Sequence, residues 1–118
     1  MTVDDFFARH PEARAVHEAV QAAVEAIGPA RVRVGKSQVG FSRAHPFAAT
    51  WRPEQYLRRA RAPLVLSVYL RRRDASPRWK EVVEPRPGRF THHLELSSAQ
   101  EVDDFVRARL AEAWKEAG

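Results

Sequence analysis

The sequence predicts a single α+β domain over residues 1–118, in which an antiparallel sheet of about four strands has the N- and C-terminal helices packed on one of its faces. Two patterns predict this class. Apolar residues recur at three- and four-residue steps near both ends of the chain, whereas apolar and polar residues alternate in the middle. Short links between the alternating segments favour antiparallel pairing, because parallel strands need crossovers of about a dozen residues or more.

The first long helix is expected to begin at Pro11, because a proline in the first turn lacks only an N–H that would have no partner within the helix. Gly28 and Pro29 are expected to end it, with the glycine as a left-handed cap. Residues 3–9 are expected to form a short helix or an extended arm. The buried stripe of the long helix is Ala13, Val16, Val20, Ala23, Val24 and Ile27.

The middle of the chain is expected to form the sheet. In the first alternating segment the apolar phase switches at Gly35, which indicates either a glycine bulge or a break between two strands. A polar link over residues 54–61, with room for one helical turn, separates the second segment from the third. The expected strands are residues 31–41, 47–51, 64–70 and 90–96.

The last helix is expected over residues 98–116, because Ser98 and Glu101 have the spacing of a capping box. Its buried face would be Val102, Phe105, Val106, Leu110, Ala113 and Trp114. Trp114 and Trp51 both fit apolar stripes and are expected in the core.

Composition limits the kind of site that the chain can carry. The sequence has no cysteine, which excludes disulfides, thiolate metal sites and cysteine nucleophiles. Its first residues are acidic where a secretory signal would be basic, and no apolar run approaches the roughly 20 residues that span a bilayer. We therefore expect a cytoplasmic protein with no membrane partner. No metal-ligand spacing or cofactor motif appears, so no metal and no cofactor is expected.

The net charge is +5, and the excess of Lys and Arg over Asp and Glu lies between residues 58 and 89. This segment includes the loop before the last strand, which also carries Trp79. This predicts a non-enzymatic binding or interaction module that holds an acidic partner or a nucleic acid. An arginine-rich surface can also serve solubility alone, and Trp79 can instead fold down to cover an end of the sheet. The expected contact residues are Arg71, Arg73, Arg78, Trp79, Lys80, Arg86 and Arg89.

A second hypothesis places a small-molecule site, or an undiscovered enzyme, on the open face of the sheet. His92 shares the parity of the apolar positions of its strand and is expected in the core, whereas His93 faces the other way with Glu95. A carboxylate near an imidazole can support acid–base chemistry. The residues expected to converge are Lys36, Gln38, His93 and Glu95. No recognisable catalytic constellation accompanies them, which favours binding over catalysis.

Several segments resemble a bacterial family described only as a domain of unknown function. They are Lys36-Ser37-Gln38-Val39, Leu64-Val65-Leu66-Ser67, Ser76-Pro77-Arg78-Trp79-Lys80-Glu81, Pro87-Gly88-Arg89-Phe90 and His92-His93-Leu94-Glu95-Leu96. Short stand-alone members of this family are similar to the chain over roughly residues 4–116. Related domains occur at the C-termini of larger chains labelled predicted transport proteins. The resemblance implies an uncharacterised domain and supplies no activity or established functional residue.

Overall fold

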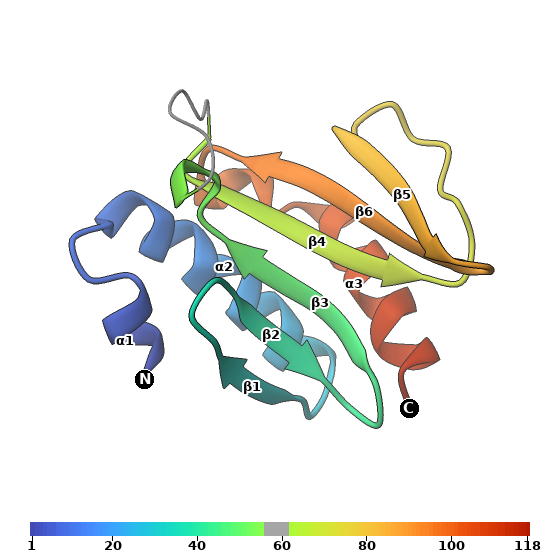
Figure 1. Cartoon of the computed structure of the whole chain (residues 1–118), viewed down its shortest axis with the longest axis horizontal. Coiled ribbons are helices and arrows are strands. Elements are labelled where there is room, and N and C mark those ends of the chain that lie inside the picture. The colour runs from blue at the N-terminus through green and yellow to red at the C-terminus, as the bar shows by residue number, and fades with distance from the viewer. Residues whose placement is uncertain (56–61) are drawn as a thin grey trace.

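The computed structural model describes residues 1–55 and 62–118, and Figure 1 shows helices behind one face of an antiparallel sheet. The described helices are α1 (Val3–Phe6), α2 (Pro11–Ile27) and α3 (Asp104–Glu116), with short 3₁₀ turns at Pro53–Gln55 and Ala99–Glu101. The strands are β1 (Arg31–Val34), β2 (Val39–Ser42), β3 (Pro46–Trp51), β4 (Leu64–Leu70), β5 (Glu81–Arg86) and β6 (Arg89–Leu96).

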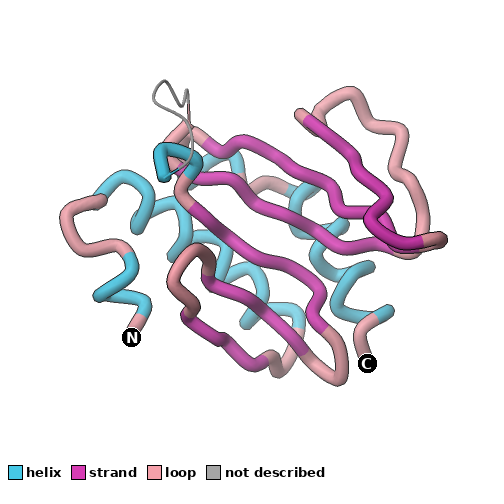
Figure 2. The backbone as a smooth tube through the Cα atoms, in the orientation of Figure 1, coloured by secondary structure: helices cyan, strands magenta, loops and turns pink. Residues whose placement is uncertain are grey.

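The sheet has the order β1-β2-β3-β4-β6-β5, with antiparallel neighbours throughout. The predicted α+β class is confirmed, with α2 and α3 on the same side of the sheet (Figure 2). No described helix covers the other face, which is turned to the viewer in Figure 1. Among the described residues, no helix combines the length and apolar character needed to cross a membrane.

The prediction of about four strands is wrong, because the sheet has six. The segment 31–41 is two strands, β1 and β2, so the break at Gly35 was the correct alternative. The N–H of Gly35 donates to the carbonyl of Gln38 across 2.8 Å and closes the turn. The loop before the last strand also contains β5. Its charged residues and Pro85 interrupt the alternation of apolar and polar residues that predicts a strand. Pro85 is tolerated because β5 is an edge strand with an irregular register beyond Val83.

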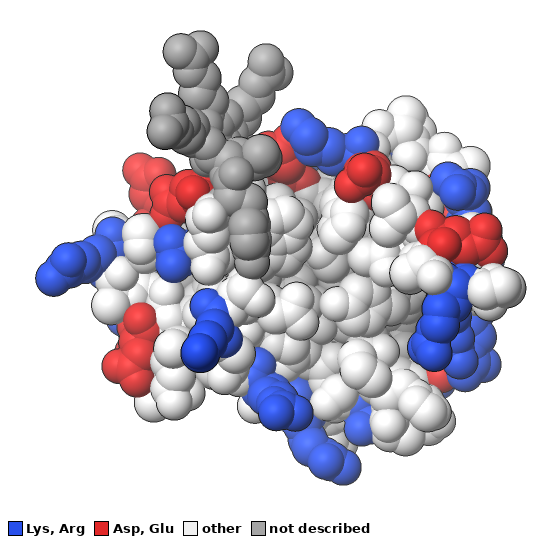
Figure 3. Space-filling model, viewed as in Figure 1, with Lys and Arg blue, Asp and Glu red and all other residues white. Residues whose placement is uncertain are grey.

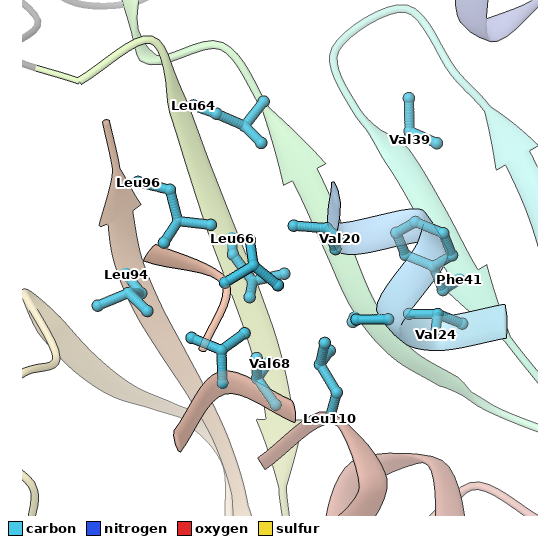
Figure 4. Packing of buried hydrophobic residues seen from close by; sticks show 14 of the residues in the cluster. Val20, Val24, Val39, Phe41, Leu64, Leu66, Val68, Leu94, Leu96 and Leu110 are labelled. Carbon is cyan, nitrogen blue, oxygen red and sulfur yellow. The ribbon is translucent and has the colours of Figure 1, made fainter. Parts of the chain in front are cut away.

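The core lies between the helices and the sheet (Figure 4). Leu64, Leu66 and Val68 of β4 point into it at alternate positions and are fully buried. Val20 of α2 and Leu110 of α3 contact this layer from the helical side. Each such side chain stabilises the fold by about 1.5–3 kcal/mol through removal of apolar surface from water.

His17 of α2 is the buried polar link between the helical layer and β3. Its Nε2 lies 2.8 Å from Gln21 Oε1, and its Nδ1 lies 2.8 Å from Thr50 Oγ1. An amide oxygen only accepts, so Nε2 carries the hydrogen and Nδ1 accepts from the Thr50 hydroxyl. Burial lowers the pKa of His17, which keeps this imidazole neutral.

Two helix ends differ from the sequence-based prediction. Gly28 ends α2 with φ 166°, which is extended backbone and not the predicted left-handed cap. At the other end of the chain, residues 98–103 precede α3 instead of belonging to it. Ser98 makes no capping bond, and Asp103 caps α3 by accepting from the Val106 N–H across 3.2 Å. The nearer carboxylate therefore sets the start of the helix.

Candidate small-molecule site on the open sheet face

The uncovered face of the sheet carries a cavity of about 730 Å³. This volume falls within the roughly 300–1,000 Å³ of ordinary ligand pockets. Its floor comes from β3, β4 and β6, and one end is closed by the β5–β6 hairpin and the C-terminus of α3. Figure 3 shows this face, with uncharged surface across the middle and a group of Lys and Arg side chains at the right-hand end.

The floor residues reach this face because side chains alternate along a strand. On β4, Ser67 and Tyr69 point away from the helices, since Leu66 and Val68 point toward them. The register aligns Ser67 with His93 and Tyr69 with Thr91 of β6. Directly paired residues share a face, so four polar side chains lie together over the middle of the sheet.

A hydrogen-bonded group occupies the centre of the floor. The Trp51 indole N–H donates to Ser67 Oγ across 3.0 Å, and Ser67 Oγ lies 2.7 Å from Nδ1 of His93. The rings of Trp51 and His93 meet edge to face at 6.0 Å. Burial lowers the pKa of His93, and the charge of Glu81 on the neighbouring strand opposes this shift in part.

Tyr69 supplies an aromatic wall beside this group. Burial raises the pKa of its phenol, and a hydrogen bond with the Gln38 side chain opposes the rise. Phe90 lines the cavity on the hairpin side. Tyr69 and Gln38 both line the cavity, one from β4 and the other from the turn before β2.

The charged end of the cavity is formed by Arg71, Arg86, Arg89 and Glu116. Arg71 is held by Glu116, because its Nη2 donates to the Glu116 carbonyl at 2.8 Å and its backbone N–H donates to the carboxylate at 3.0 Å. Arg86 and Arg89 are exposed, and within residues 1–55 and 62–118 neither has an ion-pair partner. Three arginines and one glutamate give this end a formal charge of +2.

Trp79 does not belong to an exposed surface. Its side chain is only 7% exposed, and it packs against His92 and Phe105. Its indole N–H donates to Asp74 Oδ2 across 2.7 Å, and the Asp74 N–H donates to Nε2 of His92 at 2.9 Å. The expectation of an exposed recognition residue is therefore wrong, and Trp79 has a packing role. His92 is in the core, as predicted.

Two further residues of the predicted basic surface are engaged by carboxylates. Nη1 of Arg78 lies 2.8 Å from both oxygens of Asp103, and its Nη2 donates to the Glu101 carbonyl at 2.9 Å. Lys80 pairs with Glu95 across 2.5 Å. Arg73 is exposed and lies over the Phe90 ring at 5.5 Å. Arg58, Arg59 and Arg61, which contribute to the charge excess, lie outside the described residues.

The structure brings together two of the four residues predicted for the open face. Gln38 and His93 line the cavity. Lys36 is exposed in the turn between β1 and β2 and lies outside the lining. Glu95 is also outside it, paired with Lys80. The predicted convergence of the first and last strands fails because β3 and β4 lie between them.

Sequence reasoning missed Trp51, Ser67 and Tyr69 as site residues. The alternation of β4 could have identified Ser67 and Tyr69. Trp51 was expected in the core because it shares sequence parity with Phe47, which is fully buried. An irregularity in the β2–β3 register, where Ser42 pairs with Pro46, makes Phe47 an extra residue of β3 and breaks that parity. Trp51 is consequently half-buried on the open face.

Within the part of the chain that the structure describes, no group of three or more His, Asp or Glu side chains is placed to hold a metal ion. The cavity is lined mainly by aromatic rings, arginines and uncharged polar side chains, with Glu116 as the carboxylate among the described lining residues.

The fold and this cavity define a class of protein: a small α+β domain with a ligand-sized hollow on the uncovered face of an antiparallel sheet. The chain belongs to the DUF5655 family, described as a domain of unknown function, whose model matches residues 3–117. No curated protein and no solved structure matches the chain. Membership agrees with the resemblance to an uncharacterised domain family and assigns no activity.

Proposed function

We propose that the domain binds a small organic anion in the open-face cavity and does so without catalysing a reaction. The observation that carries this proposal is the presence of Arg86 and Arg89, exposed and free of ion-pair partners among the described residues, at the end of a cavity with aromatic walls. The ligand would place its acidic group at the arginines and its apolar part against Tyr69 and Trp51.

The chemistry of these side chains supports an anion. A guanidinium donates two parallel hydrogen bonds to a carboxylate or phosphate, and such charge-assisted bonds are about twice as strong as neutral ones. Tyr69 and Trp51 offer apolar area with a polar edge, a combination common in binding sites. The only carboxylate among the described lining residues is Glu116, which already accepts the backbone N–H of Arg71. The described lining therefore offers no pair of carboxylates for acid–base catalysis, which favours binding.

The same contacts favour a small ligand over a nucleic acid or an acidic protein. Arg78 and Lys80, which a polyanion would need, already pair with Asp103 and Glu95. Arg72 pairs with Glu112 in the same way. Affinity for nucleic acid comes largely from cations that neutralise phosphates, so paired cations reduce it.

Isothermal titration calorimetry with matched anions and neutral analogues tests this proposal. The pairs are benzoate with benzamide, and adenosine monophosphate with adenosine. We expect an anion to bind in at least one pair, its neutral analogue to bind at least tenfold more weakly, and the affinity to fall with salt.

The variants Arg86→Gln and Arg89→Gln locate the binding site, and Arg107→Gln is their matched control. Arg107 is an exposed arginine of α3, outside the cavity, that pairs with Asp104 on its own helix. Both cavity variants should weaken anion binding, and the control should not. Equal affinity for anions and neutral analogues, or undiminished binding in both cavity variants, would overturn the proposal.

A further inference from the structure

We infer that Trp51, Ser67 and His93 form a hydrogen-bond relay that presents the Nε2–H of His93 to the ligand, and that the ligand carries an uncharged acceptor oxygen or nitrogen in addition to its acidic group. This inference rests on the proposed function and adds to it a second recognition element. The acidic group identifies a class of anions, and the acceptor selects members within that class.

The direction of the relay follows from which groups can donate. The indole N–H of Trp51 is only a donor, so Ser67 Oγ accepts at 3.0 Å. The hydroxyl hydrogen of Ser67 then points to Nδ1 of His93 at 2.7 Å. In the opposite arrangement Nδ1 would donate, Ser67 would accept twice, and its own hydrogen would need another acceptor. No second acceptor for Ser67 is present among the described residues.

Burial removes water as an alternative partner for the hydroxyl. Ser67 is only 3% exposed, so solvent has little access to it. Burial also lowers the pKa of His93, which favours the neutral imidazole at pH 7. A neutral imidazole whose Nδ1 accepts must carry its hydrogen on Nε2.

Nε2 is the free end of this relay. Among the described residues Nε2 has no hydrogen-bond partner. The buried side-chain nitrogen and oxygen atoms without a partner, again among the described residues, are Arg52 Nε and His92 Nδ1, so Nε2 of His93 is not a buried atom. Nε2 is therefore open to the cavity that His93 lines. The edge-on contact with Trp51 holds the ring in this orientation.

The charge of Glu81 determines the kind of acceptor. Glu81 lies directly opposite His93 in the β5–β6 pair, and its charge acts on the imidazole. The negative charge of Glu81 therefore disfavours a second anionic group of the ligand at Nε2. A carbonyl oxygen, ether oxygen or ring nitrogen accepts the N–H without that repulsion. The acidic group belongs at Arg86 and Arg89.

The relay itself is tested without any ligand, by ¹⁵N NMR of the histidine rings. We expect His93 to be entirely the Nε2–H tautomer in the wild type and a mixture of the two neutral tautomers in Ser67→Ala, because an imidazole without a partner at Nδ1 populates both. Trp51→Phe removes the donor that orients the hydroxyl and should cause a smaller loss of the Nε2–H tautomer, which keeps the test valid if Ser67→Ala folds poorly. Ser42→Ala is the matched control, since Ser42 is half-buried on β2 and lies outside the cavity. An unchanged tautomer in both relay variants would overturn the relay.

The acceptor is tested with 3- and 4-acetylbenzoate against the 3- and 4-isopropylbenzoates, which have similar shape but no acceptor. We expect one acetyl compound to bind about tenfold more tightly than its isopropyl partner, and this preference to disappear in Ser67→Ala. Equal affinity within both pairs would overturn the acceptor requirement. If no anion binds the wild type while the Nε2–H tautomer is present, the proposed function fails together with the acceptor requirement, and the relay remains.

Discussion

Asp74 and Arg109 join the loop after β4 to α3 through a hydrogen bond of 2.9 Å between Oδ2 and Nε. The same carboxylate accepts from Trp79 and from Arg72. Burial alone would raise the pKa of Asp74, but hydrogen bonds from Arg109, Trp79 and Arg72 hold that pKa at about 2. The buried Asp74 carboxylate thus fixes the loop after β4 against α3, although the sequence predicts an exposed loop there.

Asp74→Asn is expected to destabilise the domain by about 2–3 kcal/mol, because it leaves Arg109 and Trp79 without a charged acceptor. Urea unfolding followed by circular dichroism measures this. Trp79→Phe keeps the carboxylate paired with two arginines and should cost less, about 1 kcal/mol. A smaller effect for Asp74→Asn than for Trp79→Phe would show that ring packing, and not the carboxylate, holds the loop.

The stability of the domain should fall as the solution is made mildly acidic. Burial lowers the pKa of His17 and of His92 from the ordinary 6.5. Below pH 6.5 the unfolded chain therefore binds more protons than the folded domain, and the free energy of unfolding decreases as the pH falls toward the folded-state values. We expect a stability that is constant between about pH 7.5 and 8.5 and declines below about pH 6.5.

Urea titrations across pH 5 to 8 measure this slope. His17→Gln should reduce it, whereas Gln100→Ala should leave it unchanged because Gln100 is exposed and carries no titratable group. A stability independent of pH over this range would contradict the prediction.

Gly28→Ala is expected to destabilise the domain by about 1–3 kcal/mol through overcrowding. A Cβ at this position would lie 2.5 Å from Cζ2 of Trp114, and the indole is held by a hydrogen bond to the Pro29 carbonyl and by the Arg43 guanidinium above its ring. Thermal unfolding of Gly28→Ala measures the loss. Gly35→Ala is the matched control, since its nearest contact would be an ordinary 3.4 Å. Equal effects would rule out the close approach of Trp114 as the cause.

Arg78 and Arg86 should respond differently to the same substitution. Arg78→Gln breaks contacts to Asp103 and to the Glu101 carbonyl, so we expect a loss of about 1 kcal/mol in the free energy of unfolding. Arg86→Gln should leave stability within about 0.5 kcal/mol, because it is exposed and has no ion-pair partner among the described residues. The reverse ranking would mean that Arg86 is a structural residue and would weaken its assignment to the ligand.

Periodicity predicted the elements that bury a continuous apolar face. The helix from Pro11 to Ile27 and the strand from Leu64 to Leu70 were predicted with their observed bounds, because their apolar residues recur at the spacing of one face. β5 escaped prediction because an exposed edge strand has no apolar face to reveal it. Helix α3 starts later than predicted because the Asp103 carboxylate competes with Ser98 for the capping role.

The sequence predicted site residues only where alternation along a strand was enough to show which face of the sheet a side chain occupies. His93 and Gln38 were found in this way, but Lys36 and Glu95 were not placed with them because strand order is not encoded in alternation. The basic residues were predicted from charge alone. Charge does not distinguish a cation held by a carboxylate, such as Lys80, from one such as Arg89, which has no ion-pair partner among residues 1–55 and 62–118. Those pairings depend on tertiary contacts between segments far apart in the sequence.

The cavity draws its lining from segments between Ser37 and Ala117, including three neighbouring strands and the end of α3. These segments come together only when the whole sheet has formed, so the unfolded chain offers a ligand no comparable surface. Any molecule that occupies the cavity therefore shifts the folding equilibrium, by about 2.7 kcal/mol at a concentration one hundred times its dissociation constant. The melting temperature of the domain can consequently identify its ligand from a library of anions without an assay of activity.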